Sequence, residues 1–257
     1  MFFSDLDRTI IYSTRFIDPP MPFLVTPVES LKGRHISHMT LDSYESLQEL
    51  RSRIEFVPVT ARTIDEVLRI SFIHKDIPTW MVCENGKVIY HKGKRLREWD
   101  DLVGNKLLQQ QKDLNEATKT FLYLAKVHGV TLNTLNEFAF LFKTENGSER
   151  FIEDLQKKKE WFREYGCRLY NSGRKVYFMP SILNKGNAVR YLIQTLKPEK
   201  TVGAGDSTMD ISFLKEVTYP VAPQHHTIPQ CPYPVTSQTG MKAGEQIIQY
   251  AMMKLCR

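Results

Sequence analysis

The stretch MFFSDLDRTII, residues 1–11, places two carboxylates two residues apart directly behind a run of hydrophobic residues. If the period of a strand continued, Asp5 and Asp7 would lie on one face with their like charges close together. That arrangement is costly unless a cation lies between the carboxylates or the chain turns away. The stretch therefore predicts a short buried strand that ends in a pair of acidic residues with a chemical role.

Strand and helix patterns alternate over the next 75 residues. Hydrophobic strands are expected at 54–59 and 81–83, with a helix that begins after the N-cap Thr40 and another that runs through Val67 and Phe72. Between the first strand and the first helix, the proline-rich segment 12–39 predicts a loop or a small hairpin. This β-α-β-α-β order is typical of a parallel sheet with right-handed crossovers.

The pattern changes between residues 86 and 178. Strands are expected there around 137–142, 167–170 and 175–178, with helices around 104–128 and 148–165, as in an antiparallel α+β unit. The alternation then resumes with a helix at 185–196, a strand at 201–204 and a turn into another helix at 207–214. A long proline-rich connection at 220–234 and a final helix at 242–255 follow. The sequence thus predicts a doubly wound, Rossmann-like α/β core (1–85 and 179–257) with an inserted α+β unit (86–178).

Composition limits the class of protein. The 257 residues are 42% hydrophobic and 25% charged, as in ordinary globular proteins, and carry a formal net charge of +6. We find no apolar run of the roughly 18 residues that a membrane span needs and no signal-peptide pattern. The four cysteines are scattered, which fits a reducing compartment, so we expect a cytoplasmic protein. Basic residues are not interleaved with aromatic ones, and neither nucleic acid nor membrane is expected as a partner.

Four short elements stand at the ends of expected core strands or at the starts of helices, where open α/β sheets build their sites. They are Asp5-Leu6-Asp7-Arg8-Thr9, Thr60-Ala61-Arg62, Asn184-Lys185-Gly186 and Gly205-Asp206-Ser207-Thr208-Met209-Asp210. In this order, with an inserted unit between the second and the third, they resemble the haloacid dehalogenase superfamily of phosphohydrolases with a type-two cap. The chain looks most similar to the sugar-phosphate phosphatase branch, which includes sucrose-phosphate phosphatase and mannosyl-phosphoglycerate phosphatase.

The resemblance implies a role for each element. Asp5 would attack phosphorus and form an aspartyl-phosphate, and Asp7 would act as general acid and base. Mg²⁺ would lie between Asp5, the backbone carbonyl of Asp7 and Asp206, with support from Asp210. Phosphate oxygens would be bound by the residues Thr60, Ala61, Arg62 and Lys185. The expected function is Mg²⁺-dependent hydrolysis of a small-molecule phosphate ester, a sugar phosphate first of all, with the inserted unit reading the leaving group.

Three positions depart from the family pattern. Arg8 stands where the family most often has Gly, Ala61 replaces a Gly, and Met209 stands where relatives commonly have Asn. These departures keep open a non-catalytic module that binds a phosphorylated ligand. A phosphomutase or phosphotransferase of the same fold also stays open, because the phosphomannomutases carry a similar cap. The sequence does not decide the substrate or the oligomeric state.

Other candidate residues favour structural roles. Adjacent histidines rarely converge on one metal ion, so we expect His225 and His226 to lie in a surface loop. Phe138, Phe140 and Phe142 alternate along an expected strand and predict a buried core.

Overall fold

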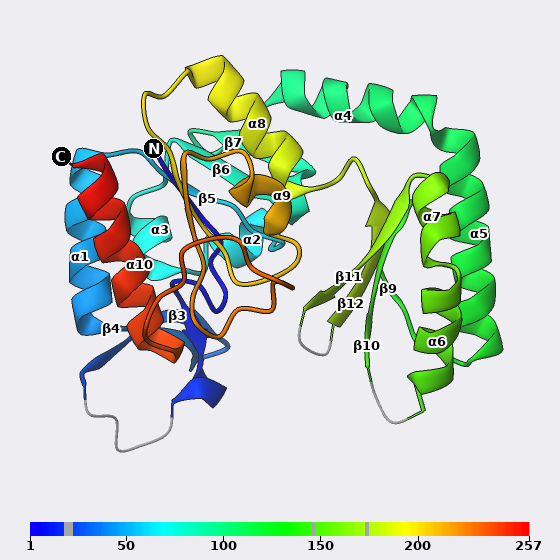
Figure 1. The fold of residues 1–257 in the computed structure, drawn as a ribbon, viewed down its shortest axis with the longest axis horizontal. Helices are drawn as coiled ribbons and strands as arrows, with labels where there is room; N and C mark the ends of the chain where they lie inside the picture. The colour runs from blue at the N-terminus through cyan, green and yellow to red at the C-terminus, as the bar shows by residue number, and fades with distance from the viewer. Residues whose placement is uncertain (18–22, 145–146, 173–174, 257) are drawn as a thin grey trace. The chain divides into compact units, whose positions relative to one another are not determined.

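The structure, a computed structural model, describes residues 1–17, 23–144, 147–172 and 175–256 (Figure 1). The chain divides into two compact units, a larger one of Met1–Arg97 with Asn184–Arg257 and a smaller one of Glu98–Leu183. In the sequence, the smaller unit is inserted into the larger one, so the larger unit is built from two separate stretches of the chain. Among the described helices, none has both the length and the apolar character that a membrane span requires.

The larger unit contains a central parallel sheet and a separate antiparallel hairpin. Its elements are β1 (Phe2–Ser4), β2 (Tyr12–Ser13), β3 (Val25–Leu31), β4 (Arg34–Thr40), α1 (Leu41–Arg53), β5 (Phe56–Pro58), α2 (Ile64–Val67), α3 (Ser71–Lys75), β6 (Trp80–Cys83), β7 (Val88–His91), β8 (Lys94–Arg95), α8 (Lys185–Leu196), β13 (Val202–Ala204), α9 (Ile211–Leu214), β14 (Tyr219–Val221) and α10 (Gly240–Leu255).

The parallel sheet has the strand order β14-β13-β1-β5. In β1, Phe2 is paired with Val202 of β13 on one side and with Phe56 of β5 on the other. The sheet continues toward β6 through a single parallel bridge between Val59 and Val82. The first strand of the sequence is therefore in the interior of the sheet, as expected for a doubly wound fold, and the predicted α/β class is confirmed.

Helices cover both faces of this sheet. Val202 and Ala204 pack in one hydrophobic cluster with Ile247, Ile248 and Ala251 of α10. A Cβ on the intervening Gly203 would instead meet Leu214, at the end of α9, at 3.4 Å. Because successive residues of a strand face opposite sides, α9 and α10 lie on opposite faces. Helix α1 runs beside α10 (Figure 1), begins at its predicted cap and has the side chain of Thr40 accepting from the Ser43 N–H.

The segment 12–39 forms a hairpin. Strands β3 and β4 are antiparallel, and β2 adds to the far side of β4. The turn between β3 and β4 uses Lys32 and Gly33, both at positive φ, as a tight two-residue hairpin turn requires. Residues 18–22 of this segment lie outside the described residues.

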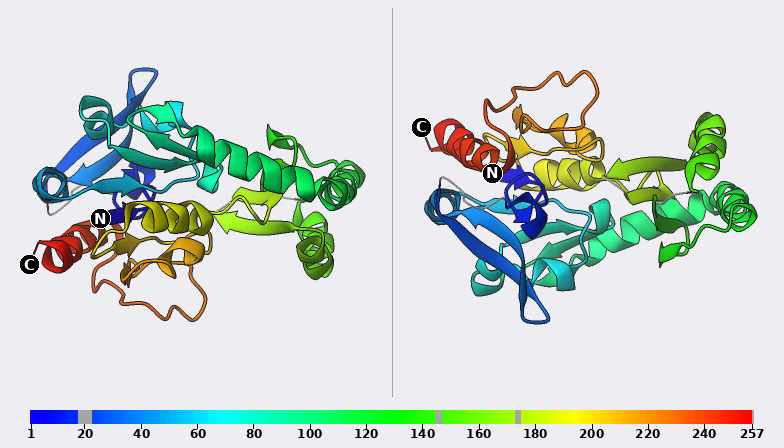
Figure 2. Two further views of the ribbon diagram at one scale, coloured as in Figure 1. Left: turned by 90° about the horizontal axis from the view of Figure 1, so that it is seen from above. Right: turned by 90° about the horizontal axis from the view of Figure 1, so that it is seen from below.

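The smaller unit is an antiparallel sheet with helices. Its elements are α4 (Arg97–Gln109), α5 (Gln111–Val127), β9 (Asn133–Asn136), β10 (Ala139–Lys143), α6 (Glu149–Lys157), α7 (Lys159–Glu164), β11 (Cys167–Ser172) and β12 (Lys175–Pro180), and its strand order is β11-β12-β10-β9 (Figure 1). The helices that follow α4 in this unit lie on one side of its sheet (Figure 2). Phe140 and Phe142 are buried together with Phe121 of α5 and Phe151 of α6, which confirms the expected apolar core.

The structure differs from the expected elements in several places. The helices expected at 104–128 and 148–165 are each two helices, α4 with α5 and α6 with α7, and residues 179–183, expected in the core, belong to the smaller unit. Residues 86–97, expected within the inserted unit, belong to the larger unit because β7 and β8 pair with β6. The helix expected through Val67 and Phe72 is two short helices, α2 and α3. Strand β14 was not expected, since Pro220 lies within it. A role of the smaller unit in reading the leaving group stays a prediction.

Candidate active site

Three core strands end at one edge of the sheet, and each is followed by a candidate site residue. Asp5 follows β1, Asp206 lies two residues beyond β13, and Thr60 lies two residues beyond β5. Since parallel strands present their carboxyl ends at the same edge, residues separated by up to 200 positions meet there. Asp210 and Lys185 join them at the starts of α9 and α8.

The chain turns away directly after Asp5. The carbonyl oxygen of Leu6 accepts hydrogen bonds from the backbone N–H groups of Thr9, Ile10 and Ile11, and Arg8 adopts a left-handed conformation with φ of 61°. This turn interrupts the alternation of side chains along the strand, so the side chains of Asp5 and Asp7 lie in different environments. Asp5 is buried, whereas the side chain of Asp7 is 53% exposed. The costly like-charge pair predicted from the strand period is thereby avoided.

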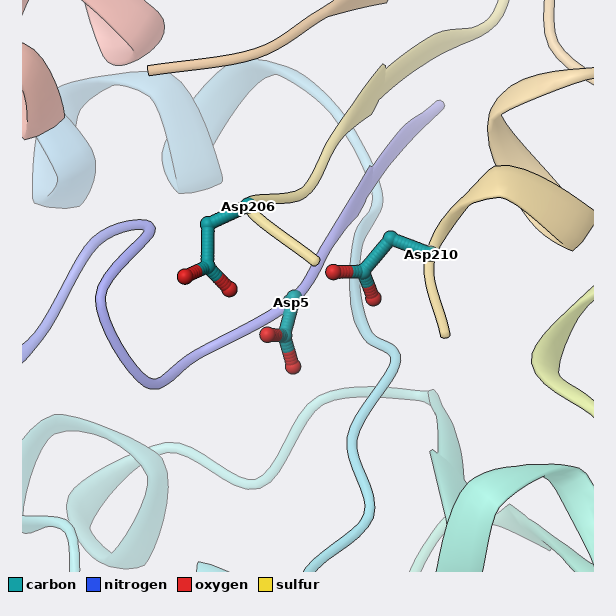
Figure 3. A group of neighbouring side chains, drawn as sticks. All are labelled: Asp5, Asp206 and Asp210. Atoms are coloured by element: carbon teal, nitrogen blue, oxygen red, sulfur yellow. The ribbon is translucent and has the colours of Figure 1, made fainter. Parts of the chain in front are cut away.

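Three buried carboxylates face one another at this edge. Asp5, Asp206 and Asp210 each offer an oxygen atom, and these atoms lie within 4.8 Å of one another (Figure 3). Gly205 permits this approach, because a Cβ at that position would meet the side chain of Asp210, with its Cγ at 2.6 Å. Asp210 is fixed further by Ser207, whose backbone N–H and hydroxyl both donate to Oδ2 at 2.8 Å.

Lys185 supplies a positive charge inside this group. Its side chain is 2% exposed, and Nζ donates to Asp5 Oδ1 at 2.8 Å and to Asp210 Oδ1 at 2.6 Å. Helix α8 holds the lysine in place, since the Asn184 side chain caps its start by accepting from the Asn187 N–H. A lysine in the first turn opposes the helix dipole, so the two carboxylates must stabilise it there.

The buried charges alter one another's protonation. Burial, reinforced by Asp210 and Asp206 against the opposing effect of Lys185, raises the pKa of Asp5 well above its usual value. Burial and the charge of Asp210 raise the pKa of Asp206 to about 6. Burial alone would lower the pKa of Lys185, but Asp210 and Asp5 raise it, so the lysine stays charged. Perturbations of this kind are common at functional sites.

The donor set fits Mg²⁺. Among the described residues, the hydrogen bonds of Asp5 and Asp206 use only one carboxylate oxygen each, which leaves Asp5 Oδ2 and Asp206 Oδ1 available. Both oxygens of Asp210 are already engaged, by Lys185 and by Ser207. Hard oxygen donors beside a net negative charge suit this cation. Asp5 and Asp206 are therefore better placed than Asp210 to contact a metal directly.

Arg62 binds Asp7 in this structure. Its Nε and Nη2 donate to the two carboxylate oxygens of Asp7 at 2.7 Å, a forked ion pair that fixes the orientation of the carboxylate. Nη1 lies 2.9 Å from Glu29, whose fully buried carboxylate also accepts from Ser37 and Arg69. The guanidinium expected to contact phosphate thus links Asp7 to the β3–β4 hairpin.

The other expected phosphate ligands lie nearby. Thr60 is 1% exposed, and its Oγ1 accepts from the backbone N–H of Arg62 at 3.2 Å. Its own N–H donates to Val82, which anchors the strand end. Ala61 lies between them and is partly exposed. The structure thus brings Asp5, Lys185, Asp206 and Asp210 into one cluster and holds Asp7 and Arg62 as a pair beside it.

Contacts of Arg8, His225 and Glu29 at the site were not foreseen. Arg8 pairs with Asp206, and the backbone oxygen of Arg8 accepts from Nε2 of His225 at 2.8 Å. Nδ1 of His225 accepts from Gly240, so both ring nitrogens are used and the expectation of a loop residue, not a metal ligand, is supported. The other unforeseen residue is Glu29. No local motif marks it, and the strand that carries it, Val25–Leu31, mixes apolar and polar residues.

Replacing Gly205 with Ala should destabilise the larger unit by about 1–3 kcal/mol, because the added methyl group overlaps the Asp210 side chain. The free energy of urea unfolding measures the change. Gly104→Ala is a matched control, since a Cβ there meets nothing within 4 Å and the residue lies inside α4, where alanine should stabilise by roughly 0.5–1 kcal/mol. Equal stabilities of the two variants would contradict the tight packing of Asp210 on Gly205.

Comparison with known proteins gives a consistent result. Residues 1–227 match the model of the family described as sucrose-6F-phosphate phosphohydrolase. Nothing among curated protein sequences matches the chain. The solved sucrose-phosphatase of Synechocystis sp., in complex with sucrose and phosphate, superposes with a TM-score of 0.63 at 17% identity, over 97% of this chain and 96% of that one.

Two further structures share the fold. A haloacid dehalogenase-like hydrolase from B. subtilis has a TM-score of 0.59 at 18% identity, over 97% of this chain and 99% of that one. The C-terminal domain of the C. albicans trehalose-6-phosphate phosphatase also has a TM-score of 0.59, at 13% identity, over 97% of this chain and 91% of that one.

Proposed function

Because the chain belongs to the sucrose-6F-phosphate phosphohydrolase family, and is a phosphatase of the haloacid dehalogenase superfamily, we propose that it hydrolyses a sugar phosphate with Mg²⁺ through an aspartyl-phosphate. The observation that carries the proposal is the buried cluster of Asp5, Lys185, Asp206 and Asp210 at the carboxyl edge of the sheet.

A carboxylate oxygen of Asp5 attacks phosphorus in line with the ester oxygen, and the bond between phosphorus and the sugar oxygen breaks. For this step Arg62, which binds both oxygens of Asp7 in the structure, releases one of them to carry a proton, and Asp7 gives that proton to the departing sugar oxygen. Asp7 then accepts a proton from a water molecule that attacks the aspartyl-phosphate, which releases inorganic phosphate and restores Asp5.

The positive charges of the site stabilise phosphate. Lys185 and the hydroxyl of Thr60 contact its oxygens, where negative charge is concentrated. Asp5, Asp206 and the backbone carbonyl of Asp7 would hold Mg²⁺, supported by Asp210, and the bound cation would supply further neutralisation of the phosphate charge. Lys185 is already held between Asp5 and Asp210, so it needs no rearrangement to reach a phosphate bound to Asp5.

The substrate is proposed to be the phosphate ester of a small sugar. Sucrose phosphate is the first compound to test, because the family description names it and the solved Synechocystis structure contains sucrose and phosphate. Trehalose phosphate is the second, given the trehalose-6-phosphate phosphatase with the same fold.

Phosphate release from these esters, from hexose monophosphates and from p-nitrophenyl phosphate should require Mg²⁺. Removal of the metal with EDTA is expected to lower the rate by about 10³-fold or more, and added Mg²⁺ should restore it, because the phosphate charge is then neutralised again. A rate unaffected by EDTA would overturn the metal requirement. Transfer of phosphate to a second sugar without free phosphate would indicate a phosphotransferase instead.

A further inference from the structure

Arg8 occupies a position that the backbone favours for glycine. Its φ of 61° lies in the left-handed region, where a non-glycine residue is uncommon. Backbone hydrogen bonds hold the residue there: its N–H donates to Ile11 at 2.8 Å, and its carbonyl oxygen accepts from His225 at 2.8 Å. The turn therefore projects a long cationic side chain from the segment that carries Asp5 and Asp7.

The side chain of Arg8 is directed onto Asp206. Nε donates to Asp206 Oδ2 at 2.9 Å, and Nη2 donates to the backbone oxygen of His225 at 3.1 Å. The guanidinium carbon also lies 5.5 Å from the centre of the Phe16 ring, within the range of a cation–π contact. Only 33% of the side chain is exposed, against 8% for that of Asp206. Three independent contacts thus fix the guanidinium on a carboxylate of the acidic cluster.

This ion pair changes the charge that a divalent cation would meet. When all three are ionised, Asp5, Asp206 and Asp210 carry three negative charges, and Lys185 offsets one of them. Arg8 offsets a second and engages one of the two oxygens of Asp206. With Arg8 the cluster has a net charge of −1, and without it the net charge would be −2.

We propose that Arg8 is a built-in competitor of the divalent cation, which weakens metal binding at Asp206. The inference rests on the proposed metal site and goes beyond it, since it assigns to this arginine control over the affinity of that site. An arginine that served the substrate phosphate alone would leave metal affinity unchanged.

The test measures Mg²⁺ binding directly, by isothermal titration calorimetry without substrate at pH 8. Arg8→Gly and Arg8→Asn remove the charge and suit the left-handed backbone, and both should lower the Kd about tenfold relative to the unmodified protein. Arg8→Lys keeps the charge and should stay within about twofold. Arg15→Asn is the matched control: Arg15 also lies over Phe16, at 4.8 Å, but makes no ion pair with Asp206.

Each outcome decides the proposal. Tighter binding in both neutral variants, but not in Arg8→Lys or Arg15→Asn, supports it. Unchanged or weaker binding in the neutral variants, with Mg²⁺ binding intact in the unmodified protein, overturns the role of Arg8 and leaves the metal site standing. Absence of Mg²⁺ binding in all variants overturns both. A cooperative thermal unfolding transition in EDTA serves as the control that each variant is folded.

Discussion

Replacing Asp5 by Asn should reduce kcat for phosphate release by roughly 10⁴-fold, the scale on which removal of a nucleophile acts. The amide cannot form the acyl phosphate, although it keeps the shape of the carboxylate and one acceptor for Lys185. Initial rates of phosphate release at saturating Mg²⁺ and substrate give the change.

The fold should survive this substitution. Burial raises the pKa of Asp5, so the ionised form is unfavourable in the metal-free protein, and a neutral side chain removes that cost. The midpoint of thermal unfolding in EDTA should therefore not fall. Asp42→Asn at the start of α1, where the side chain is 74% exposed, is the matched control and should keep its activity. A folded Asp5→Asn protein with unchanged kcat would exclude Asp5 as the nucleophile.

Replacing Lys185 by Met should destabilise the metal-free protein by about 3–5 kcal/mol, because it leaves Asp5 and Asp210 buried without their counter-charge. Urea unfolding at pH 7.5 in EDTA measures this loss. Lys157→Met, where the lysine is 72% exposed and forms an ion pair with Asp154 on the surface of α6, should leave the stability almost unchanged. Similar losses in the two variants would contradict the central position of Lys185.

The difference in the free energy of unfolding between Lys185→Met and the unmodified protein should become smaller as the pH is lowered from 7.5 to 5.5. Burial, aided by neighbouring carboxylates, raises the pKa of Asp5 and raises that of Asp206 to about 6 in the folded protein. The folded state then binds protons more tightly than the unfolded state, so these groups favour folding more at low pH and lose that contribution as pH rises through about 6. Without the positive charge of Lys185, the carboxyl groups of the cluster should take up protons more readily than in the unmodified protein, which relieves the unpaired charge at low pH. A deficit that grows on acidification would overturn this account.

Much of the fold follows from local patterns. The cap Thr40, the strand that ends just before Asp5 and the helix that begins at Lys185 lie where the sequence places them, because capping residues and apolar periodicity act over a few positions. Residues 86–97 were placed in the wrong unit, since only their pairing with β6, a tertiary contact, assigns them.

The site was predictable to the same extent. Asp5, Lys185, Asp206 and Asp210 meet because parallel strands share a carboxyl edge, a rule that residue order alone can apply. The pairing of Arg62 with Asp7 and Glu29 was not predictable: Glu29 comes from a hairpin whose own pattern does not reveal which way its side chains face. Met209, which replaces a common Asn, is 4% exposed, and no contact in the structure explains the change.

The interior position of β1 has a consequence for how the protein is made. Phe2 pairs with Phe56 early in synthesis, but its other neighbour is Val202. At typical elongation rates of about 5–20 residues per second, β1 presents an unpaired hydrophobic edge for roughly 10–40 seconds before β13 emerges. Such an edge is a template for strand addition by other chains. Nascent chains that stall before residue 200 should therefore depend on chaperones, and the acidic cluster can assemble only late, when the second half of the larger unit docks.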